Sequence, residues 1–279
     1  MLDFIRVAAC VPTVTVGNTL RNTEAILGMA RKAAEKQPQL TVFPELSLTG
    51  YTCADLFFQS ALLQGAKDGL RGIVRASAAL SSALAVGLPL ELGGRLYNCA
   101  AIVAGGRLLG LVPKTYIPNY NEFYEKRWFT PGAELALSEV SAEALGLGDL
   151  QGEAVPIGTD LIFDAGAFRF GAEICEDLWA TVPPSAYLAM GGAEVMLNLS
   201  ASNETISKRR YRRSLVSAQS AAQLDGYVYV SAGCTESTTD LIFSGHSMIC
   251  EAGRMIAENR ETIDGDYILF GDIDLGKMR

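Results

Sequence analysis

The sequence is poor in the residues on which most hydrolases depend. It contains one histidine, His246, and six cysteines, and no two cysteines form a C-x-x-C pair. A zinc site needs several such ligands at close spacing, and a catalytic Cys-His pair has only His246 to use. We therefore expect no metal site, a structural role for His246, and reduced cysteines that mostly pack in the core.

Several motifs of other enzyme classes are also missing. The sequence has no G-x-S-x-G elbow, no G-x-x-x-x-G-K-[ST] phosphate loop and no G-x-G-x-x-G dinucleotide motif, which argues against a serine hydrolase or a nucleotide site. The net charge of -8 argues against binding to nucleic acid. One basic cluster is present, and we interpret it as a solvated helix face. It comprises Lys208, Arg209, Arg210, Arg212 and Arg213.

Long apolar segments and targeting signals are missing as well. No uncharged run reaches the roughly 18 to 20 residues that a membrane helix needs, and the first residues do not have the form of a secretory signal. We therefore expect a cytoplasmic protein that does not bind membranes. No Pro/Gly/Ser-rich linker divides the chain, so we expect one domain over residues 1–279.

The hydrophobic content of 49% supports a large core, and its pattern alternates between strands and helices. Gly93-Gly94 and Gly105-Gly106 mark hairpin turns in an antiparallel meander. This alternation predicts a layered α/β fold. The expected helices cover residues 18–36, 54–82, 183–190 and 205–224, and the expected strands include residues 4–10, 40–43, 83–92, 161–164, 167–174, 195–199, 227–232, 242–250, 255–258 and 267–274.

Three reactive side chains follow apolar strands directly, where a rigid scaffold can present them to a pocket: Glu45, Lys114 and Cys175. A thiol attacks a carbonyl as thiolate, and with an ordinary pKa of about 8.5 it needs an activator at neutral pH. A buried glutamate can serve as the base, because burial raises its pKa. A lysine can stabilise the oxyanion of a tetrahedral intermediate. Together the three predict a cysteine-dependent hydrolase.

The surrounding segments resemble the nitrilase, or carbon-nitrogen hydrolase, superfamily. The matching blocks are Phe43-Pro44-Glu45-Leu46, Pro113-Lys114-Thr115-Tyr116 and Glu173-Ile174-Cys175-Glu176-Asp177, and a fourth segment, Glu125 to Gly132, looks like the one that supplies a further active-site glutamate, Glu125. The resemblance implies a four-layer α-β-β-α sandwich that associates into homo-oligomers. It also implies that Glu45 is the general base, that Lys114 binds the oxyanion, and that Glu125 assists.

Within that superfamily the sequence resembles the glutaminase domain of glutamine-dependent NAD synthetases. The similar segments are Cys175 to Trp179, Tyr116 to Glu125, Val182 to Ser185, Asn198 to Ser202 and Glu236 to Leu241. The resemblance implies that L-glutamine forms a glutamyl thioester with Cys175 and releases ammonia. It places the backbone N–H of Glu176 at the oxyanion, and Tyr120, Ser202 and Lys208 at the amino-acid end of the substrate, with Arg209 as an alternative to Lys208.

The synthetase domain of that family, which begins with an S-G-G-x-D-S type loop, has no counterpart in this sequence. We expect an excised glutaminase domain, or a separate protein that delivers ammonia to a synthetase partner. ATP and magnesium are then expected only for the synthetase, with no cofactor in this chain. Two alternatives stay open: a stand-alone nitrilase-type amidase for another small amide or nitrile, and a binding module without activity.

Overall fold

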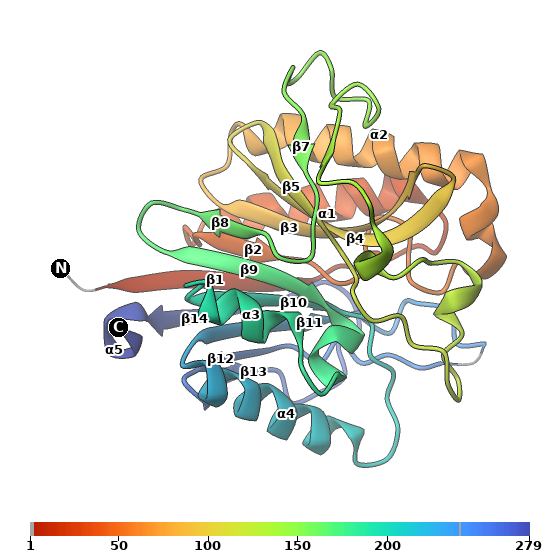
Figure 1. The fold of residues 1–279 in the computed structure, drawn as a ribbon. Coiled ribbons are helices and arrows are strands. Elements are labelled where there is room, and N and C mark those ends of the chain that lie inside the picture. Colours follow the sequence, from red (N-terminus) through yellow and green to blue (C-terminus); the bar gives the residue numbers. More distant parts are fainter. Residues whose placement is uncertain (1–2, 240) are drawn as a thin grey trace.

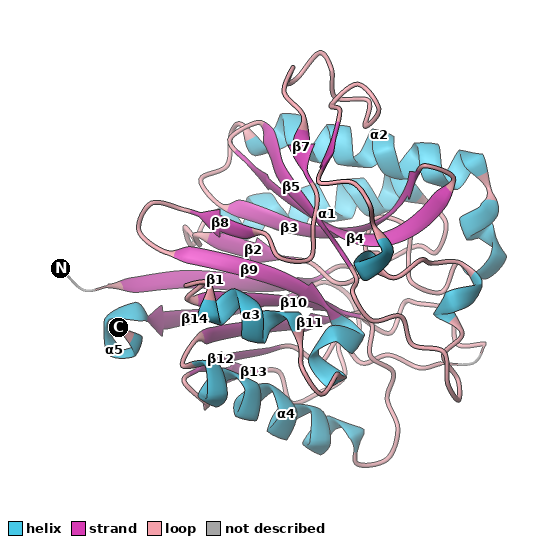
Figure 2. Ribbon diagram, viewed as in Figure 1, coloured by secondary structure: helices cyan, strands magenta, loops and turns pink. Residues whose placement is uncertain are grey.

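The computed structural model describes residues 3–239 and 241–279 (Figure 1). Met1, Leu2 and Asp240 lie outside the described residues, and the last of these belongs to the segment Glu236 to Leu241 named above. Two six-stranded sheets form the centre of the molecule (Figure 2). Strands thus account for both inner layers of the fold.

The first sheet has the strand order β14-β1-β2-β3-β4-β5, and the second has the order β13-β12-β11-β10-β9-β8. The first contains β14 (Tyr267–Asp274), β1 (Phe4–Val11), β2 (Leu40–Val42), β3 (Ala83–Leu92), β4 (Arg95–Ala104) and β5 (Arg107–Pro113). The second contains β13 (Arg254–Glu258), β12 (Met248–Glu251), β11 (Gly226–Ser231), β10 (Val195–Ser200), β9 (Arg169–Ile174) and β8 (Ile162–Asp164).

Helices cover the outer face of each sheet, which gives four layers (Figure 1). On the first sheet lie α1 (Thr19–Ala34) and α2 (Ser60–Ser77), and on the second lie α3 (Pro184–Met190) and α4 (Lys208–Gln223). The predicted α-β-β-α sandwich is confirmed. The remaining elements are the short pair β6 (Glu139–Val140) and β7 (Val155–Pro156), the helix α5 (Leu275–Met278), and the 3-10 helices η1 (Ala54–Phe58), η2 (Glu125–Arg127), η3 (Gly132–Glu134) and η4 (Cys175–Trp179).

Strand β1 shows why its sequence is continuously apolar from Val7 to Val11. Ile5, Val7 and Ala9 lie in the core between the two sheets, whereas Ala8 and Cys10 pack against the helices of the first sheet. Successive side chains of a strand point to opposite faces, so a strand that is buried on both faces needs apolar residues at every position. The same two-sided burial holds the strand ends rigidly in place.

Several sequence predictions were wrong in detail. The helix expected over 54–82 is broken at Gln59, which has extended backbone, and α2 ends at Ser77. Phe57 and Leu62, on either side of the break, are buried in the same cluster, so the apolar pattern continues across it. The strand expected over 242–250 is confined to β12, because Gly245 has a φ of 69° and interrupts extended structure. The pair β6 and β7 was not predicted.

The basic cluster is not a uniformly solvated helix face. Arg212 is completely buried and forms an ion pair with Glu204 at 2.7 Å. An unpaired buried guanidinium would be very costly, so this pairing explains how Arg212 can lie under the helix. Arg210 and Arg213 are exposed, as expected for a helix surface.

Candidate active site

The two sheets bring the three reactive side chains together. Glu45 follows β2 and Lys114 follows β5, both in the first sheet, whereas Cys175 follows β9 in the second. Glu45 and Lys114 are fully buried, and Cys175 is 7% exposed. Gly87 on β3 permits this arrangement, because a Cβ atom there would lie 2.2 Å from the backbone nitrogen of Leu46.

A strained turn presents the thiol. Cys175 begins η4 and has a φ of 45°, a left-handed conformation that is uncommon for a residue other than glycine. The carboxylate of Asp177 holds the turn, accepting hydrogen bonds from the backbone N–H of Ile174 at 3.0 Å and of Tyr116 at 2.8 Å. Asp177 therefore connects the turn of Cys175 to the segment that follows Lys114. Backbone strain of this kind is typical of functional sites.

A compact network of charges lies at the base of the site. The Lys114 Nζ donates to Glu45 Oε1 at 2.7 Å and to both Glu125 carboxylate oxygens at 2.9 Å. Asn98 Nδ2 donates to Glu45 Oε1 at 2.6 Å, and the backbone N–H of Ala201 donates to Glu45 Oε2 at 2.9 Å. Both carboxylates are buried, so the ammonium group and these donors offset their desolvation.

The electrostatics of this network are mutually dependent. Burial alone would lower the pKa of Lys114, but the carboxylates of Glu125 and Glu45 outweigh it and raise that pKa well above its ordinary value. Burial raises the pKa of Glu125, against the opposing effect of Lys114. The hydroxyl of Tyr51 donates to Glu125 at 2.8 Å and fixes its orientation.

The thiol is not ionised in this environment. Burial raises the pKa of Cys175 far above its ordinary value, and the nearby Glu45 raises it further, although Lys114 acts in the opposite direction. A resting thiolate is therefore disfavoured. A thiol in this environment needs a general base that takes its proton as it attacks, and Glu45 is the candidate for that role.

Cys175 opens into a cavity of about 310 Å³ with a polar rim. All four of the substrate-binding residues predicted from the sequence line it, namely Tyr120, Glu176, Ser202 and Lys208, and so does Glu125.

Two of the rim residues carry opposite charges. The hydroxyl of Tyr120 donates to the carboxylate of Glu176 at 2.8 and 3.0 Å. The ammonium of Lys208 lies 5.3 Å from the ring centre of Phe123 and 5.5 Å from that of Trp179, within range of cation–π attraction. Arg209, the alternative to Lys208, binds the carbonyl oxygen of Asn259 and lines a different groove.

Sequence reasoning missed several residues that build the site. Tyr51 and Asp177 orient groups of the catalytic network, and Glu236 accepts the backbone N–H of Tyr51 at 2.8 Å. Glu236 and Asp177 lie in segments that carried the family resemblance, but no role was assigned to them. Asn98 lies inside strand β4, where no end-of-strand signal marks it.

His246 and the other cysteines lie elsewhere. The Nε2 of His246 lies 3.1 Å from Glu258 Oε1, and among the described residues that line the Cys175 cavity there is no histidine. All six cysteines are described, and all are free thiols. The described part of the chain contains no group of three or more histidine, cysteine or carboxylate side chains suited to a metal ion.

Of the helices in the described ranges, none combines the length and hydropathy needed to cross a membrane.

Several known proteins have sequences similar to nearly the whole of this chain. The protein named glutamine-dependent NAD(+) synthetase from Mycobacterium tuberculosis is 41% identical over 279 residues, which cover 99% of this chain and 40% of that protein. The rat protein of the same name is 30% identical over 92% of this chain and 36% of its own length. The chain thus spans about two fifths of the length of these relatives.

Solved structures agree with the fold. The glutamine-dependent NAD(+) synthetase from Cytophaga hutchinsonii superposes with a TM-score of 0.85 at 26% identity, over 97% of this chain and 43% of that one. Nit3 from Saccharomyces cerevisiae, a nitrilase-superfamily member, superposes with a TM-score of 0.76 at 18% identity, over 99% and 92% of the two chains. The family model of carbon-nitrogen hydrolases matches residues 6–279. The chain therefore belongs to the carbon-nitrogen hydrolase family of enzymes.

Proposed function

We propose that this chain is a glutamine amidohydrolase that supplies ammonia for NAD synthesis. The observation that carries the proposal is the rim of the Cys175 cavity, where the Glu176 carboxylate and the Lys208 ammonium both line the space next to the thiol. A free α-amino acid carries one positive and one negative group, so this pair suits its two charges. A simple amide or nitrile has no charged groups to pair with them, so only their contacts within the chain, from Tyr120 to Glu176 and from Lys208 to Asn203, would remain.

In the proposed reaction Cys175 forms a covalent intermediate. The thiol proton passes to Glu45 while the sulfur attacks the side-chain amide carbon of glutamine. The resulting oxyanion accepts hydrogen bonds from Lys114 and from the backbone N–H of Glu176. When the intermediate collapses, Glu45 returns the proton to the leaving nitrogen, and ammonia departs from a glutamyl thioester. Water then attacks the thioester while Glu45 takes its proton. The tetrahedral intermediate expels the sulfur, which receives that proton from Glu45, so that glutamate is released and the thiol is restored.

Lys114 needs a free N–H for this role. An ammonium group has three donors, and in the structure they contact Glu45 and both oxygens of Glu125. One of the two contacts to Glu125 can be given up without breaking the ion pair. We infer that Glu125 holds the ammonium between substrate cycles and gives up one contact as the oxyanion develops.

The relatives support a role beside a synthetase. Their names couple glutamine to NAD synthesis, and this chain aligns with about two fifths of their length. We propose that residues 1–279 form the glutaminase portion and that ammonia passes to an ATP-dependent synthetase domain or subunit. No cofactor is needed for the hydrolysis itself, because the thiol, the carboxylates and the ammonium carry each step.

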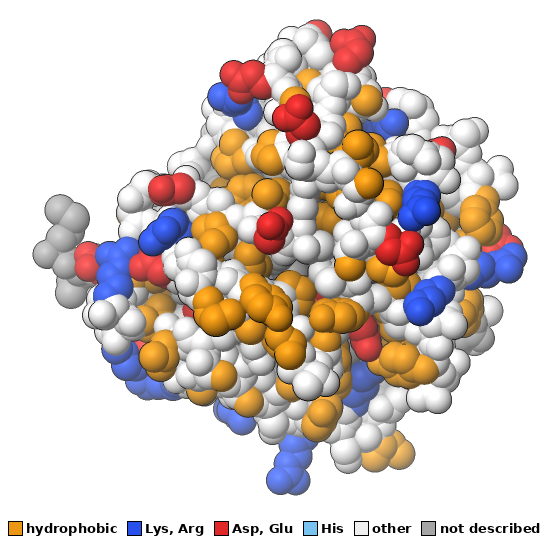
Figure 3. Space-filling view, viewed as in Figure 1, with side chains coloured by type: hydrophobic (Ala, Val, Ile, Leu, Met, Phe, Trp, Pro, Cys, Tyr) orange, Lys and Arg blue, Asp and Glu red, His pale blue; other side chains and the backbone are white. Residues whose placement is uncertain are grey.

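We also propose that the protein forms homo-oligomers. Tyr187 and Met190 on α3 and Leu224 after α4 are exposed, and hydrophobic side chains gather over the region of α3 (Figure 3). Exposed apolar patches on a stable domain often mark contacts between proteins. Light scattering of the wild-type protein and of Met190→Glu tests this: dissociation on substitution supports it, and a wild-type monomer contradicts it.

The decisive experiment measures ammonia and glutamate released from L-glutamine, together with the intact mass after treatment with a glutamine-like electrophile such as diazo-oxo-norleucine. We expect labelling in the wild type and in Cys234→Ala, a matched variant of a partly exposed cysteine, and none in Cys175→Ala. Hydrolysis of propionamide without hydrolysis of glutamine would favour the stand-alone amidase. A folded protein that neither reacts nor is labelled would contradict the enzymatic proposal.

A further inference from the structure

A second polar site lies on the other side of the first turns of α4. A groove of about 470 Å³ is lined by Ser207, Arg209, Arg210, Arg213, Glu258 and Arg260. Four arginines and one glutamate thus line the groove, in a chain whose net charge is -8. Lys208, the neighbour of Arg209, lines the Cys175 cavity instead. One helical turn therefore separates the groove from the active site.

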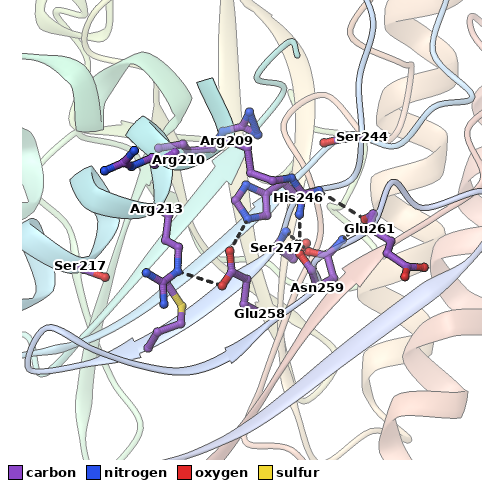
Figure 4. Close-up of polar contacts among 12 residues, drawn as sticks. Arg209, Arg210, Arg213, Ser217, Ser244, His246, Ser247, Glu258, Asn259 and Glu261 are labelled. Carbon is purple, nitrogen blue, oxygen red and sulfur yellow. Dashed lines mark hydrogen bonds and ion pairs between the residues drawn. The ribbon is translucent and has the colours of Figure 1, made fainter. Parts of the chain in front are cut away.

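The single carboxylate of the groove is already occupied. Glu258 accepts a hydrogen bond from Arg213 Nε at 3.0 Å, and its other oxygen lies 3.1 Å from His246 Nε2 (Figure 4). Burial, Arg212 and Arg209 lower the pKa of His246 to about 4, so the imidazole is neutral at physiological pH. The negative charge of Glu258 therefore offsets no more than one of the four arginines.

Among residues 3–239 and 241–279, no negatively charged side chain pairs with the other three arginines. Arg209 donates to the carbonyl oxygens of Asn259 at 2.8 Å and Glu261 at 3.3 Å, which position the guanidinium but do not neutralise it. Arg210 and Arg260 are exposed, and neither side chain forms an ion pair or hydrogen bond within the described part of the chain. A net excess of positive charge therefore remains in the groove.

This arrangement costs the isolated helix some stability. The first turn of α4 carries Lys208, Arg209 and Arg210 and no acidic residue. Cations at a helix N-terminus oppose the helix dipole, and like charges four residues apart, as at Arg209 and Arg213, repel each other. A bound anion would reverse both effects. Unfavourable local charge of this kind is expected where a site serves binding.

We propose that this arginine groove binds an anion with two linked phosphate groups, either as free pyrophosphate or as part of a larger molecule. A phosphate group carries roughly 1.5 to 2 negative charges at neutral pH, so two of them match the excess charge of the groove. The planar guanidinium fork binds phosphate oxygens in pairs. The volume is in the range of small-molecule sites, and a nucleic acid would require a longer basic track than four arginines.

The test measures binding of inorganic pyrophosphate to the whole chain by calorimetry at low salt. We expect one site in the wild type, at least about tenfold weaker binding in the double variant Arg210→Gln, Arg260→Gln, and weaker binding as salt increases. Both substituted residues are exposed and outside the catalytic cavity. The matched control is Arg21→Gln, Arg31→Gln, which removes the same charge from the exposed surface of α1 and should bind like the wild type.

Competition with further ligands identifies the source of the two phosphate groups. NAD⁺ that competes with pyrophosphate would identify a dinucleotide as the source of the two phosphates, and no competition would favour free pyrophosphate. The proposal is overturned if pyrophosphate does not bind or if the groove double variant binds it as well as the wild type. It is also overturned if orthophosphate binds equally tightly, or if an acidic peptide binds the groove and pyrophosphate does not.

Discussion

The Cys175 cavity and the arginine groove lie on opposite sides of one helical turn. They differ in how far their charged side chains are buried and paired. At the base of the cavity Lys114 is buried between Glu45 and Glu125, and every charge has a partner. In the groove Arg210, Arg213 and Arg260 are exposed and Arg209 is partly exposed, and within the described part of the chain only Arg213 forms an ion pair. Buried charges that are held in ion pairs can be aimed at a transition state, whereas exposed charges without ion pairs attract a ligand.

The largest effect is expected at the nucleophile. Cys175→Ala removes the atom that forms the covalent intermediate, so glutamine hydrolysis should fall by about five orders of magnitude or more. Because alanine is smaller and apolar, the fold should be kept. The measurement is glutamate release, with a thermal melt to show that the variant is folded. Near-normal activity would contradict the proposed mechanism.

Removing the cation at the base of the cavity should affect both activity and stability. Lys114→Met takes the counter-charge from two buried carboxylates, which should cost about 3–5 kcal/mol of unfolding free energy, and the loss of an oxyanion donor should lower kcat by about a thousandfold. Denaturant titration and steady-state kinetics measure the two effects.

The control for Lys114 is Lys126→Met, because that lysine is exposed and lies next to Glu125 in the sequence. Its stability should change by less than about 0.5 kcal/mol, as for ordinary surface positions. Equal effects of the two substitutions would mean that the buried ion pairs of Lys114 contribute no more to stability than an exposed lysine does. The proposed difference between the cavity and the groove would then be wrong.

A smaller effect is expected at Asp177, which touches neither charge network. One Asp177 oxygen accepts the backbone N–H of Tyr116, and the other accepts that of Ile174. Asp177→Asn leaves only one acceptor oxygen, so the turn of Cys175 should shift relative to Lys114. We expect kcat to fall by about 10- to 100-fold, because the thiol moves relative to Lys114, and KM to change by a smaller factor. A change confined to KM would rule out this positioning role.

The two sites also differ in how far the sequence predicts them. Glu45, Lys114 and Cys175 each end an apolar strand, a local signal that needs no knowledge of the partners. Tyr51 and Asp177 act through contacts between distant segments, and such contacts have no local signal. The family resemblance named the rim residues, and the structure brings them to the cavity.

The groove was not predicted because it, too, forms only when the fold brings separate segments together. The sequence shows a basic cluster in one helix, but Arg212 turns inward to Glu204 while Arg260 joins from the segment after β13. Only the fold separates the buried arginine from the exposed ones. The apolar pattern predicted a layered α/β fold, and the family resemblance implied the four-layer sandwich. The break at Gln59 was not predicted, because the apolar pattern continues across it.

The smallest expected effect concerns His246, the one histidine of the chain, which lies beside the groove. In the unfolded chain its pKa is about 6.5, whereas in the folded protein burial, Arg212 and Arg209 lower the pKa to about 4. Below pH 6.5 the unfolded state therefore binds a proton that the folded state does not. The contribution of His246 to stability is complete above pH 6.5 and is lost as the pH falls towards 4.

His246→Gln removes this titration and keeps a side chain that can bond to Glu258. Between pH 7.5 and pH 5 the wild type should lose about 2 kcal/mol more unfolding free energy than the variant, as measured by urea titration at both pH values. Bound pyrophosphate should reduce the difference, since an anion in the groove would weaken the positive field that keeps the imidazole neutral. Identical pH dependence in both proteins would show that the pKa of His246 is the same in the folded and unfolded states. The arginines of the groove would then have no effect on that pKa.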